Sequence, residues 1–529
     1  MAHSGEGGVM TAGLMIVGVL AVSLQAQAPT AGDPYDAPLL QGCERTVAAS
    51  PGGYFPVLVR LDGERLGAVL RGGAPHLGIG GRLDWVVSED GGRTWGGRVV
   101  VADSAWDDRN PACHSMPDGT IVVAYQECHT YDDQGRYGKG TTPSRYMVTR
   151  STDGGRTWAE PEPFPTAYGC PFGQMVPLDD GSVLTACYSW HNHIGLMRSE
   201  DSGRTWQPHA KLPGCGETAL CRDRAGRIFA FIREDLGETA LLAPDVEKTE
   251  RVGHYLRATV SKDGGKTWTE PVTLTHPAQH PGGAEALADG SLLLCYGQRA
   301  VPYGVGALHW DSSEALARLL EGGEAPLPSA RRVLVAWDCA RTDCGYPSPV
   351  QLDDGTVVVM YYAYGTLDDP KGERAAVVRF RPEELKRSVE AGEAVRLVVR
   401  DDLDQCTPEE NLRRWTWRTG LAWAHGGDLL HLRDGTGDEV LGYDPGLTGR
   451  YRVHLGTRSV TPAMKVRLRL AGEQEWDLLE LPDSEGKDAF AELEWRVADL
   501  TGKAIEIAPV AGQPAYLDYF RFTPEATGE

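Results

Sequence analysis

The sequence predicts an all-β protein in which a six-bladed β-propeller is followed by a C-terminal β-sandwich. Three observations predict this fold. An eight-residue pattern recurs four times between residues 88 and 268, six glycine-containing turns separate short apolar runs, and a different set of short strands follows position 401. Repeated β-units of about one length are typical of radial all-β architectures.

The recurring pattern is Ser-x-Asp-x-Gly-x-Thr-Trp, where x is any residue. Its Ser and Asp side chains can accept hydrogen bonds from nearby backbone N–H groups, and its glycine can adopt the positive φ that a tight turn needs. The pattern therefore predicts a β-turn whose tryptophan folds back to bury its ring between strands. The four copies are Ser88–Trp95, Ser151–Trp158, Ser199–Trp206 and Ser261–Trp268.

A second pattern places a glycine turn before a β-rich run, which is a hairpin signal. Its six copies are Asp62-Gly63, Asp118-Gly119, Asp180-Gly181, Ala225-Gly226, Asp289-Gly290 and Asp354-Gly355. Six such units predict six blades over residues 40–395, the first four ending near the repeated tryptophans. A helical insertion at Asp311–Leu320 interrupts the fifth blade, and the sixth is expected from Cys339 to Phe380.

The two ends of the chain differ from this repeat. Residues 401–529 contain short alternating runs such as Lys465–Leu470 and predict a separate β-sandwich. The apolar run Val9–Leu24 is too short for a comfortable membrane span and leads into Ala26-Gln27-Ala28, a cleavage pattern. Residues 1–28 are therefore predicted to be a signal peptide, which implies a secreted or periplasmic protein with no membrane association once the signal is removed.

Charge and cysteine usage exclude several classes of partner. The net charge is −22 and no basic block occurs, which argues against nucleic acids and anionic membrane surfaces. The eleven cysteines form no C-x-x-C spacing, and no H-E-x-x-H motif is present. We therefore predict neither a metal site nor a cofactor.

The four repeated turns resemble the Asp-box (BNR) motif of the sialidase superfamily, in which the motif is structural. In that family a Glu opens one blade, an Arg closes the following strand, a second Arg follows one blade later, and a Tyr opens the last blade. Glu217, Arg233, Arg299 and Tyr346 match this order. The resemblance covers the propeller and not the C-terminal domain.

The resemblance implies a glycosidase mechanism in which Tyr346 is the nucleophile. A phenol with a pKa near 10 attacks poorly until a carboxylate accepts its proton, and Glu217 would be that base. A neutral phenol suits an anomeric centre that carries a carboxylate, which Arg233 and Arg299 would hold through forked hydrogen bonds. The alternative is that Glu217 and Arg233 form a buried structural ion pair.

The first blade departs from the family pattern. The family opens this blade with an Arg-Ile-Pro motif, whereas Tyr54-Phe55-Pro56 stands here. The family's acid/base Asp is expected near His76, and the nearest carboxylate is Asp84, so either residue can be the group that protonates the leaving group. Arg71 is a candidate to replace the missing guanidinium from a neighbouring strand.

A further polar cluster opens the second blade at Asp107–Pro111. Its position directs Arg109 and Asn110 toward the same central channel, where they can contact a glycan. A local salt bridge between Asp108 and Arg109 is the alternative.

Together these features indicate an exported sialidase-like exoglycosidase that removes a terminal acidic sugar from a glycan or oligosaccharide with net retention. Two alternatives remain open. One is a non-catalytic glycan-binding propeller, and the other is a glycan-cleaving enzyme of different sugar specificity, such as a lyase, on the same fold. The sequence makes no prediction of oligomeric state.

Overall fold

The computed structural model divides the chain into Met1–Asp33 and Pro34–Glu529. It describes residues 37–189, 193–235, 254–276, 278–299, 303–322, 330–337, 339, 342–365, 372–391, 396–397, 416–418, 429–432, 435–459, 465–480, 489–517 and 519–524. The predicted signal peptide and the start of the predicted C-terminal domain therefore lie outside the described residues.

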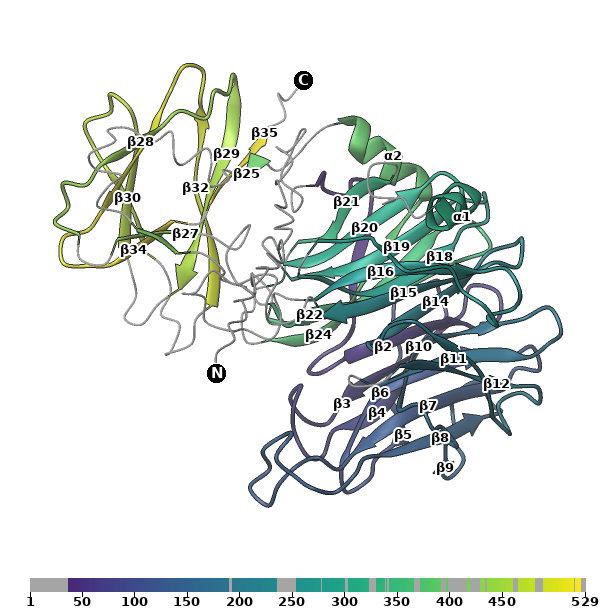
Figure 1. The fold of residues 1–529 in the computed structure, drawn as a ribbon. Helices are drawn as coiled ribbons and strands as arrows, with labels where there is room; N and C mark the ends of the chain where they lie inside the picture. The colour runs from purple at the N-terminus through teal and green to yellow at the C-terminus, as the bar shows by residue number, and fades with distance from the viewer. Residues whose placement is uncertain are drawn as a thin grey trace, which may run out of the picture. The chain divides into compact units, whose positions relative to one another are not determined.

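The prediction of an all-β protein is confirmed. The described part of the chain forms eight sheets, and its helices are α1 (Ser313–Gly322) and α2 (Pro382–Ala391) (Figure 1). No helix within these residues is long and apolar enough to cross a membrane. Helix α1 lies in the expected insertion, and its buried side chains join the hydrophobic cluster shared by the fourth and fifth groups of strands described next.

Six groups of four strands follow one another along the chain, and we number them sheets 1 to 6 (Figure 1). Sheets 2 and 3 are connected by a short parallel pairing of their first strands. The strands of sheets 1 to 3 are β2 (Tyr54–Arg60), β3 (Leu66–Gly72), β4 (Arg82–Ser88), β5 (Val99–Ala102); β6 (Asp107–Ser115), β7 (Ile121–Cys128), β8 (Arg145–Ser151), β9 (Glu162–Pro163); β10 (Cys170–Pro177), β11 (Val183–Tyr188), β12 (Ile194–Ser199), β13 (Gln207–Leu212). Those of sheets 4 to 6 are β14 (Thr218–Arg222), β15 (Ile228–Asp235), β16 (His254–Ser261), β17 (Val272–Thr273); β18 (Gln279–Ala286), β19 (Leu292–Gln298), β20 (Gly304–Trp310), β21 (Arg331–Ala336); β22 (Cys344–Gln351), β23 (Val357–Tyr364), β24 (Glu373–Phe380), β1 (Glu44–Ala49).

The six sheets form a closed cycle. The first strands contact one another in the order β2, β6, β10, β14, β18, β22 and back to β2. Each neighbouring pair of sheets also shares a buried hydrophobic cluster. Burying one Val or Leu side chain contributes about 1.5–3 kcal/mol, so each of these six interfaces stabilises the ring.

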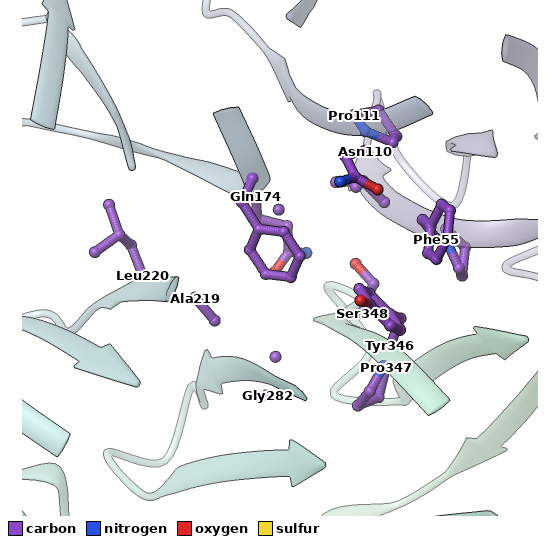
Figure 2. A pocket seen from close by; sticks show the side chains of 15 residues that line it. Phe55, Asn110, Pro111, Gln174, Ala219, Leu220, Gly282, Tyr346, Pro347 and Ser348 are labelled. Atoms are coloured by element: carbon purple, nitrogen blue, oxygen red, sulfur yellow. The ribbon is translucent and has the colours of Figure 1, made fainter. Parts of the chain in front are cut away.

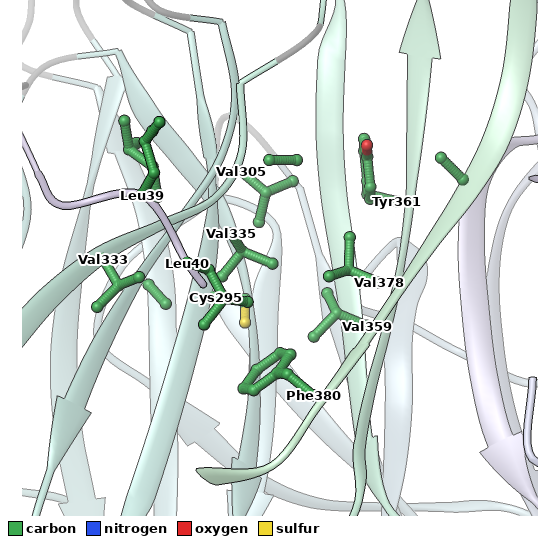
Figure 3. Packing of buried hydrophobic residues seen from close by; sticks show 14 of the residues in the cluster. Leu39, Leu40, Cys295, Val305, Val333, Val335, Val359, Tyr361, Val378 and Phe380 are labelled. Atoms are coloured by element: carbon green, nitrogen blue, oxygen red, sulfur yellow. The ribbon is translucent and has the colours of Figure 1, made fainter. Parts of the chain in front are cut away.

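The outer strand of sheet 6 comes from the other end of the chain. Strand β1 pairs antiparallel with β24, so the sixth unit is not completed by Cys339–Phe380 as the sequence suggested. The adjoining N-terminal segment packs at the interface of sheets 5 and 6, where Leu40 lies near Val335 and Cys295 of sheet 5 (Figure 3). This pairing joins the two ends of the ring by backbone hydrogen bonds.

The four Asp-box turns connect the third and fourth strands of sheets 1 to 4. In the second copy, Gly155 N donates a 2.9 Å hydrogen bond to Ser151 Oγ, and Thr157 Oγ1 donates a 2.6 Å bond to Asp153 Oδ2. The hydrogen bonds from Thr157 lower the pKa of Asp153 to about 2. Trp158 meets Trp85 edge to face at 5.5 Å, so the turn also packs against sheet 1.

The C-terminal strands form three further sheets that share one hydrophobic cluster. Side chains alternate between buried and half-buried along Lys465–Leu470, as the sequence pattern predicts. The three sheets consist of β25 (Arg396–Leu397), β35 (Tyr519–Pro524), β29 (Arg450–Ser459), β32 (Ala489–Asp499); β26 (Thr416–Arg418), β27 (Leu429–Leu432), β34 (Ala515–Leu517); and β28 (Leu441–Tyr443), β33 (Ile505–Pro509), β30 (Lys465–Leu470), β31 (Asp477–Glu480).

Candidate functional site

A repeated irregularity occurs near the start of the first strands. The strands β2, β6, β10, β18 and β22 each begin in one register with the second strand of their sheet and then shift to another within a few residues. A β-bulge bends the strand and redirects its side chains. Because these five strands all lie in the central cycle, the bulges direct side chains from different sheets toward the same place.

Three bulges contain a non-glycine residue with positive φ. The angles are 52° at Phe55, 50° at Asn110 and 49° at Tyr346, and each of these residues precedes a proline. Such a conformation is uncommon for L-residues, above all for aromatic ones, and it persists only where the surrounding structure imposes it. Strained residues of this kind concentrate at functional sites, and here they are brought together.

Tyr346 and Glu217 form the centre of the site. The Tyr346 hydroxyl donates a 2.6 Å hydrogen bond to Glu217 Oε1, while Arg233 Nη1 donates a 2.6 Å bond to Glu217 Oε2. Arg233 Nη1 also lies 3.4 Å from the phenolic oxygen. Glu217 therefore makes both contacts that the sequence left as alternatives, one to the phenol and one to the guanidinium.

The protonation state of the phenol follows from this environment. Burial, and after it the negative charge of Glu217, raises the pKa of Tyr346 above its usual value. Tyr346 is therefore a neutral hydrogen-bond donor at ordinary pH. Loss of its proton requires an acceptor within reach, and Glu217 is in that position.

Residues of sheets 2 and 3 extend the hydrogen bonding around Glu217. Tyr188, at the end of β11, places its hydroxyl 3.4 Å from Glu217 Oε1. Asn110 Nδ2 donates a 3.1 Å hydrogen bond to the same Tyr188 hydroxyl. Asn110 thus lies in the cluster that the sequence predicted, and Tyr188 connects it to the carboxylate.

Arg299 approaches Tyr346 from sheet 5. Its guanidinium carbon lies 5.6 Å from the centre of the Tyr346 ring, and only 3% of the residue is exposed. Within the described part of the chain its polar side-chain contact is a 3.4 Å hydrogen bond from Nη2 to the Tyr362 hydroxyl, no carboxylate lies within ion-pair distance, and Nε has no partner. A buried cation without a counter-ion is costly, which suits a site that receives an anion.

His76 reaches the same cluster from the loop between β3 and β4. Its Nδ1 lies 2.6 Å from Asp343 Oδ2, and Asp343 Oδ1 accepts a 2.5 Å hydrogen bond from the Tyr362 hydroxyl. The ring of His76 meets Phe55 edge to face at 5.0 Å. His76 is thereby connected through Asp343 and Tyr362 to Arg299.

The guanidiniums of Arg71 and Arg109 meet at Asp107. Arg71 is fully buried and donates a 2.7 Å bond to Asp107 Oδ1, and Arg109 donates a 3.1 Å bond to Asp107 Oδ2. The remaining Arg71 donors bond the carbonyls of Ala74, Pro75 and Gly78, which flank His76. The structure therefore gives Arg71 the contacts of a residue that shapes the His76 loop.

Arg109 and Asp84 differ in their relation to this cluster. The Arg109 guanidinium lies 5.2 Å from the Phe55 ring and 5.4 Å from the Tyr137 ring, so it borders the aromatic residues around Tyr346. Asp84 has no exposed surface, and it binds Arg82 at 2.8 Å and Arg98 at 3.3 Å. The side-chain contacts of Asp84 in the described part of the chain are thus to Arg82 and Arg98, and not to the rings and carboxylates around Tyr346.

Tyr346 is among the residues that line a cavity of about 30 Å³. Residues from all six first strands line it, and Figure 2 shows Phe55, Asn110, Gln174, Gly282 and Tyr346 around the void. The Gln174 amide donates hydrogen bonds to Leu58 O at 2.8 Å and to Pro349 O at 2.9 Å, which links sheets 1, 3 and 6. The cavity locates the common axis on which the bulged strands converge.

Sequence reasoning missed Asp343 and Tyr362. A signal was present, since carboxylates stand at the start of the first strands of alternate sheets: Asp107 in sheet 2, Glu217 in sheet 4 and Asp343 in sheet 6. Tyr362 carries no such signal because it lies within the apolar run of β23. Among the described residues no group of three or more His, Cys, Asp or Glu side chains could hold a metal ion.

Comparison with known proteins identifies the class to which this fold and its turns belong. Residues 71–359, more than half of the chain, match the family model of the BNR repeat-like domain. The chain therefore belongs to the family of BNR repeat-like proteins, as its Asp-box turns predicted.

The individual proteins that this chain resembles share low sequence identity with it. A xyloglucanase from Paenibacillus sp is 24% identical over 274 residues, which are 49% of this chain and 25% of that protein. The chain thus matches about a quarter of the length of this curated relative. A protein of unknown function from Dyadobacter fermentans DSM 18053 has a TM-score of 0.51 at 21% identity over 64% of this chain and all of its own, which supports the fold alone. The NanB sialidase from Streptococcus pneumoniae has a TM-score of 0.44 at 12% identity over 66% of this chain and 71% of its own.

Proposed function

We propose that this protein is an exo-acting, retaining glycoside hydrolase that removes a terminal acidic sugar from a glycan. The observation that carries the proposal is the 2.6 Å hydrogen bond from the Tyr346 hydroxyl to Glu217, with the guanidinium of Arg299 beside the same ring. A phenol paired with a carboxylate base is an activated nucleophile. The match to a protein named a xyloglucanase supports a glycan as the substrate class.

In the first step Tyr346 attacks the anomeric carbon as the glycosidic bond breaks. The phenolic proton passes to Glu217 Oε1, and His76 donates a proton to the departing oxygen. The product of this step is a glycosyl–tyrosine ether, with Glu217 protonated and His76 neutral. We assign the acid to His76 because both oxygens of Asp84 are bound to arginines.

In the second step water attacks the same carbon from the side that the leaving group vacated. His76 accepts the proton from water, and the departing Tyr346 oxygen recovers its proton from Glu217. Two inversions at one carbon give net retention. The enzyme is thereby returned to its starting protonation state.

We propose that Arg299 and Arg233 bind the substrate carboxylate, and that Arg109 and Asn110 bind its hydroxyl groups. Arg299 supports this role most directly, because it is buried without a carboxylate partner in the described part of the chain. Arg71 is assigned a structural role in shaping the His76 loop instead. The site needs neither a metal nor a cofactor for these steps.

We further propose that sheets 1 to 6 are the blades of a six-bladed β-propeller over residues 40–395 and that residues 401–529 form a β-sandwich. The closed cycle of first strands supports the former, and the hydrophobic cluster shared by three sheets supports the latter. Residues 1–28 are proposed to direct export to a secreted or periplasmic location.

The test is turnover by the full chain and by a Tyr346→Phe variant. The probes are 4-nitrophenyl α-glycosides of N-acetylneuraminic acid and 4-nitrophenyl glycosides of glucuronic and galacturonic acids, in both anomers. We expect one acidic sugar to be released by the unchanged protein and a loss of about 1,000-fold or more in the variant. Full hydrolysis by Tyr346→Phe would remove the mechanism.

The same assay separates the alternatives. Saturable binding of the sugar without turnover would favour a glycan-binding protein. Release of an unsaturated sugar, detected by the ultraviolet absorbance of its new double bond, would favour a lyase.

A further inference from the structure

The orientation of His76 is set by a residue from another sheet. Its Nδ1 lies 2.6 Å from Asp343 Oδ2, although His76 precedes β4 and Asp343 precedes β22. A carboxylate accepts hydrogen bonds and does not donate them when ionised, so Nδ1 carries the hydrogen. Nε2 is then the ring nitrogen that can exchange a proton with a substrate.

The ring of His76 is also held by aromatic contacts. Phe55 meets it edge to face at 5.0 Å, Tyr54 is tilted against it at 5.6 Å, and Tyr362 lies perpendicular to it at 6.2 Å. These contacts restrict rotation about both side-chain bonds. The hydrogen bond to Asp343 then fixes the flip of the ring, so that Nδ1 and not Nε2 faces this carboxylate.

Asp343 is itself held in place. Only 7% of the residue is exposed, and its second carboxylate oxygen accepts the 2.5 Å hydrogen bond from Tyr362. The Tyr362 hydroxyl lies 3.4 Å from Arg299 Nη2. A carboxylate with both oxygens engaged is a rigid support for the imidazole.

We propose that Asp343 is the positioning residue of the general acid, and that it acts through His76 without touching the substrate. This inference rests on the proposed function and extends it, because the superfamily's carboxylic acid would here be replaced by an imidazole–carboxylate pair. Asp343 keeps its charge throughout. It holds Nδ1–H while the Nε2 proton passes to the leaving oxygen in the first step and returns from water in the second.

The pair also stabilises the charged acid before the reaction. The negative charge of Asp343 favours the imidazolium that must be present to donate a proton. Among the described residues, the other polar or charged groups near His76 or its loop include the hydroxyls of Tyr54 and Tyr362, the Tyr131 hydroxyl, which accepts a 2.9 Å hydrogen bond from Gly78 N, and the Arg71 guanidinium, which bonds the carbonyls of Ala74 and Pro75. Asp343 brings a carboxylate oxygen to within 2.6 Å of Nδ1 of the ring.

The test exploits the fact that a good leaving group needs little protonation. We compare 4-nitrophenyl and benzyl glycosides of the acidic sugar that the unchanged protein cleaves, using Asp343→Asn. We expect kcat/KM to fall about 10- to 100-fold for the benzyl glycoside and by less than about threefold for the 4-nitrophenyl glycoside. The alkaline limb of the benzyl pH profile should move to lower pH, because the imidazolium has lost its charge partner.

Two further variants keep the test decisive. Asp353→Asn is the matched control, since Asp353 follows the opposite end of β22 and pairs at the surface with Arg60. Tyr362→Phe removes the hydroxyl that holds Asp343 while it keeps the ring, and it should show the same leaving-group dependence in milder form. NMR of protein with isotope-labelled histidine should show a strongly deshielded Nδ1 proton on His76 that Asp343→Asn abolishes.

Each outcome decides between distinct claims. An equal fall for both glycosides, or an unchanged Nδ1 proton in Asp343→Asn, would overturn the positioning role while the dependence on Tyr346 still supports the proposed function. No turnover of any glycoside by the unchanged protein would overturn the proposed function, and the positioning role with it.

Discussion

The hydroxyl of Tyr346 donates its hydrogen bond to a carboxylate that lies 129 positions earlier in the chain, on Glu217. Tyr346 belongs to the first strand of sheet 6, whereas Glu217 directly precedes the first strand of sheet 4. Only the closed cycle of sheets brings these two strands to a common axis. The proposed nucleophile and its proposed base therefore depend on the integrity of the whole ring.

Glu217→Gln should nearly abolish turnover while the fold is retained. The amide keeps the shape of the carboxylate but cannot accept the phenolic proton, so we expect kcat/KM to fall by about 10²- to 10⁴-fold. Steady-state kinetics on the 4-nitrophenyl glycoside measure this fall. Glu89→Gln, at an exposed Asp-box turn paired with Arg65, is the control and should retain activity. Comparable activity in both variants would contradict the assignment of Glu217 as base.

Arg299→Met and Arg71→Met should have opposite effects on stability. Arg299 has no carboxylate partner in the described structure, so its removal should leave the free energy of unfolding unchanged or increased. Arg71 is paired with Asp107, and its loss should cost about 3–5 kcal/mol because a buried charge is left uncompensated. Urea unfolding measures both changes.

Arg299→Met should also weaken the binding of an acidic substrate. Arg299→Met should raise KM for an acidic sugar, so that kcat/KM falls by about 100-fold, with little effect on stability. A large loss of stability in Arg299→Met, with KM unchanged, would show that Arg299 is a structural residue.

Asp108 should make stability fall as pH rises. Burial raises its pKa from 3.8 to about 6, and Asp108 accepts hydrogen bonds from Ser104. The folded state therefore binds more protons than the unfolded state between these values, so stability is lost on raising the pH through them, by about 3 kcal/mol for two pKa units.

Asp108→Asn removes this titration. Its free energy of unfolding, relative to the unchanged protein, should therefore rise by up to about 3 kcal/mol between about pH 4 and pH 7. Asp118→Asn provides a control, because a hydrogen bond from the backbone of Thr120 lowers the pKa of Asp118, so its titration affects stability below about pH 4, with the opposite sign, and not between pH 4 and pH 7. Parallel pH dependences in the two variants would contradict the prediction.

Gly155→Ala should destabilise the ring more than Gly154→Ala. Both glycines have positive φ, 89° and 77°, so both substitutions carry backbone strain of about 1 kcal/mol. A methyl group on Gly155 would overlap Trp85, whereas one on Gly154 would meet its nearest neighbour, Arg65, at 3.6 Å. We expect a further loss of about 1–3 kcal/mol for Gly155→Ala, measured by thermal or urea unfolding. Equal losses would show that the Asp-box does not pack against sheet 1 through this residue.

Much of the fold was predictable because it depends on local signals. The Asp-box side chains bond backbone groups within four residues, as between Asp153 and Thr157, so each turn can be recognised from its own eight residues. The pairing of Glu44–Ala49 with β24 was not predictable in this way. It joins segments more than 320 residues apart, and no local pattern in Glu44–Ala49 specifies its partner.

The candidate site was predictable only in part, for a related reason. Glu217, Arg233, Arg299 and Tyr346 followed from their order along the chain, and these four side chains contact one another directly or through the Tyr346 ring. Asp343 was missed because its role depends on a contact with His76 that spans 267 positions.

By itself the sequence determined the all-β class, the Asp-box turns and the residue types at the start of each first strand, since turn geometry and strand patterning are properties of neighbouring residues. Only the tertiary structure decided which of those residues meet. The bulged first strands converge at one axis, near which His76 joins Asp343, whereas Asp84 pairs with Arg82 and Arg98 and does not join that cluster. Hydrogen bonds and ion pairs act over a few ångströms of space, so closure of the ring, and not distance along the chain, selects the partners.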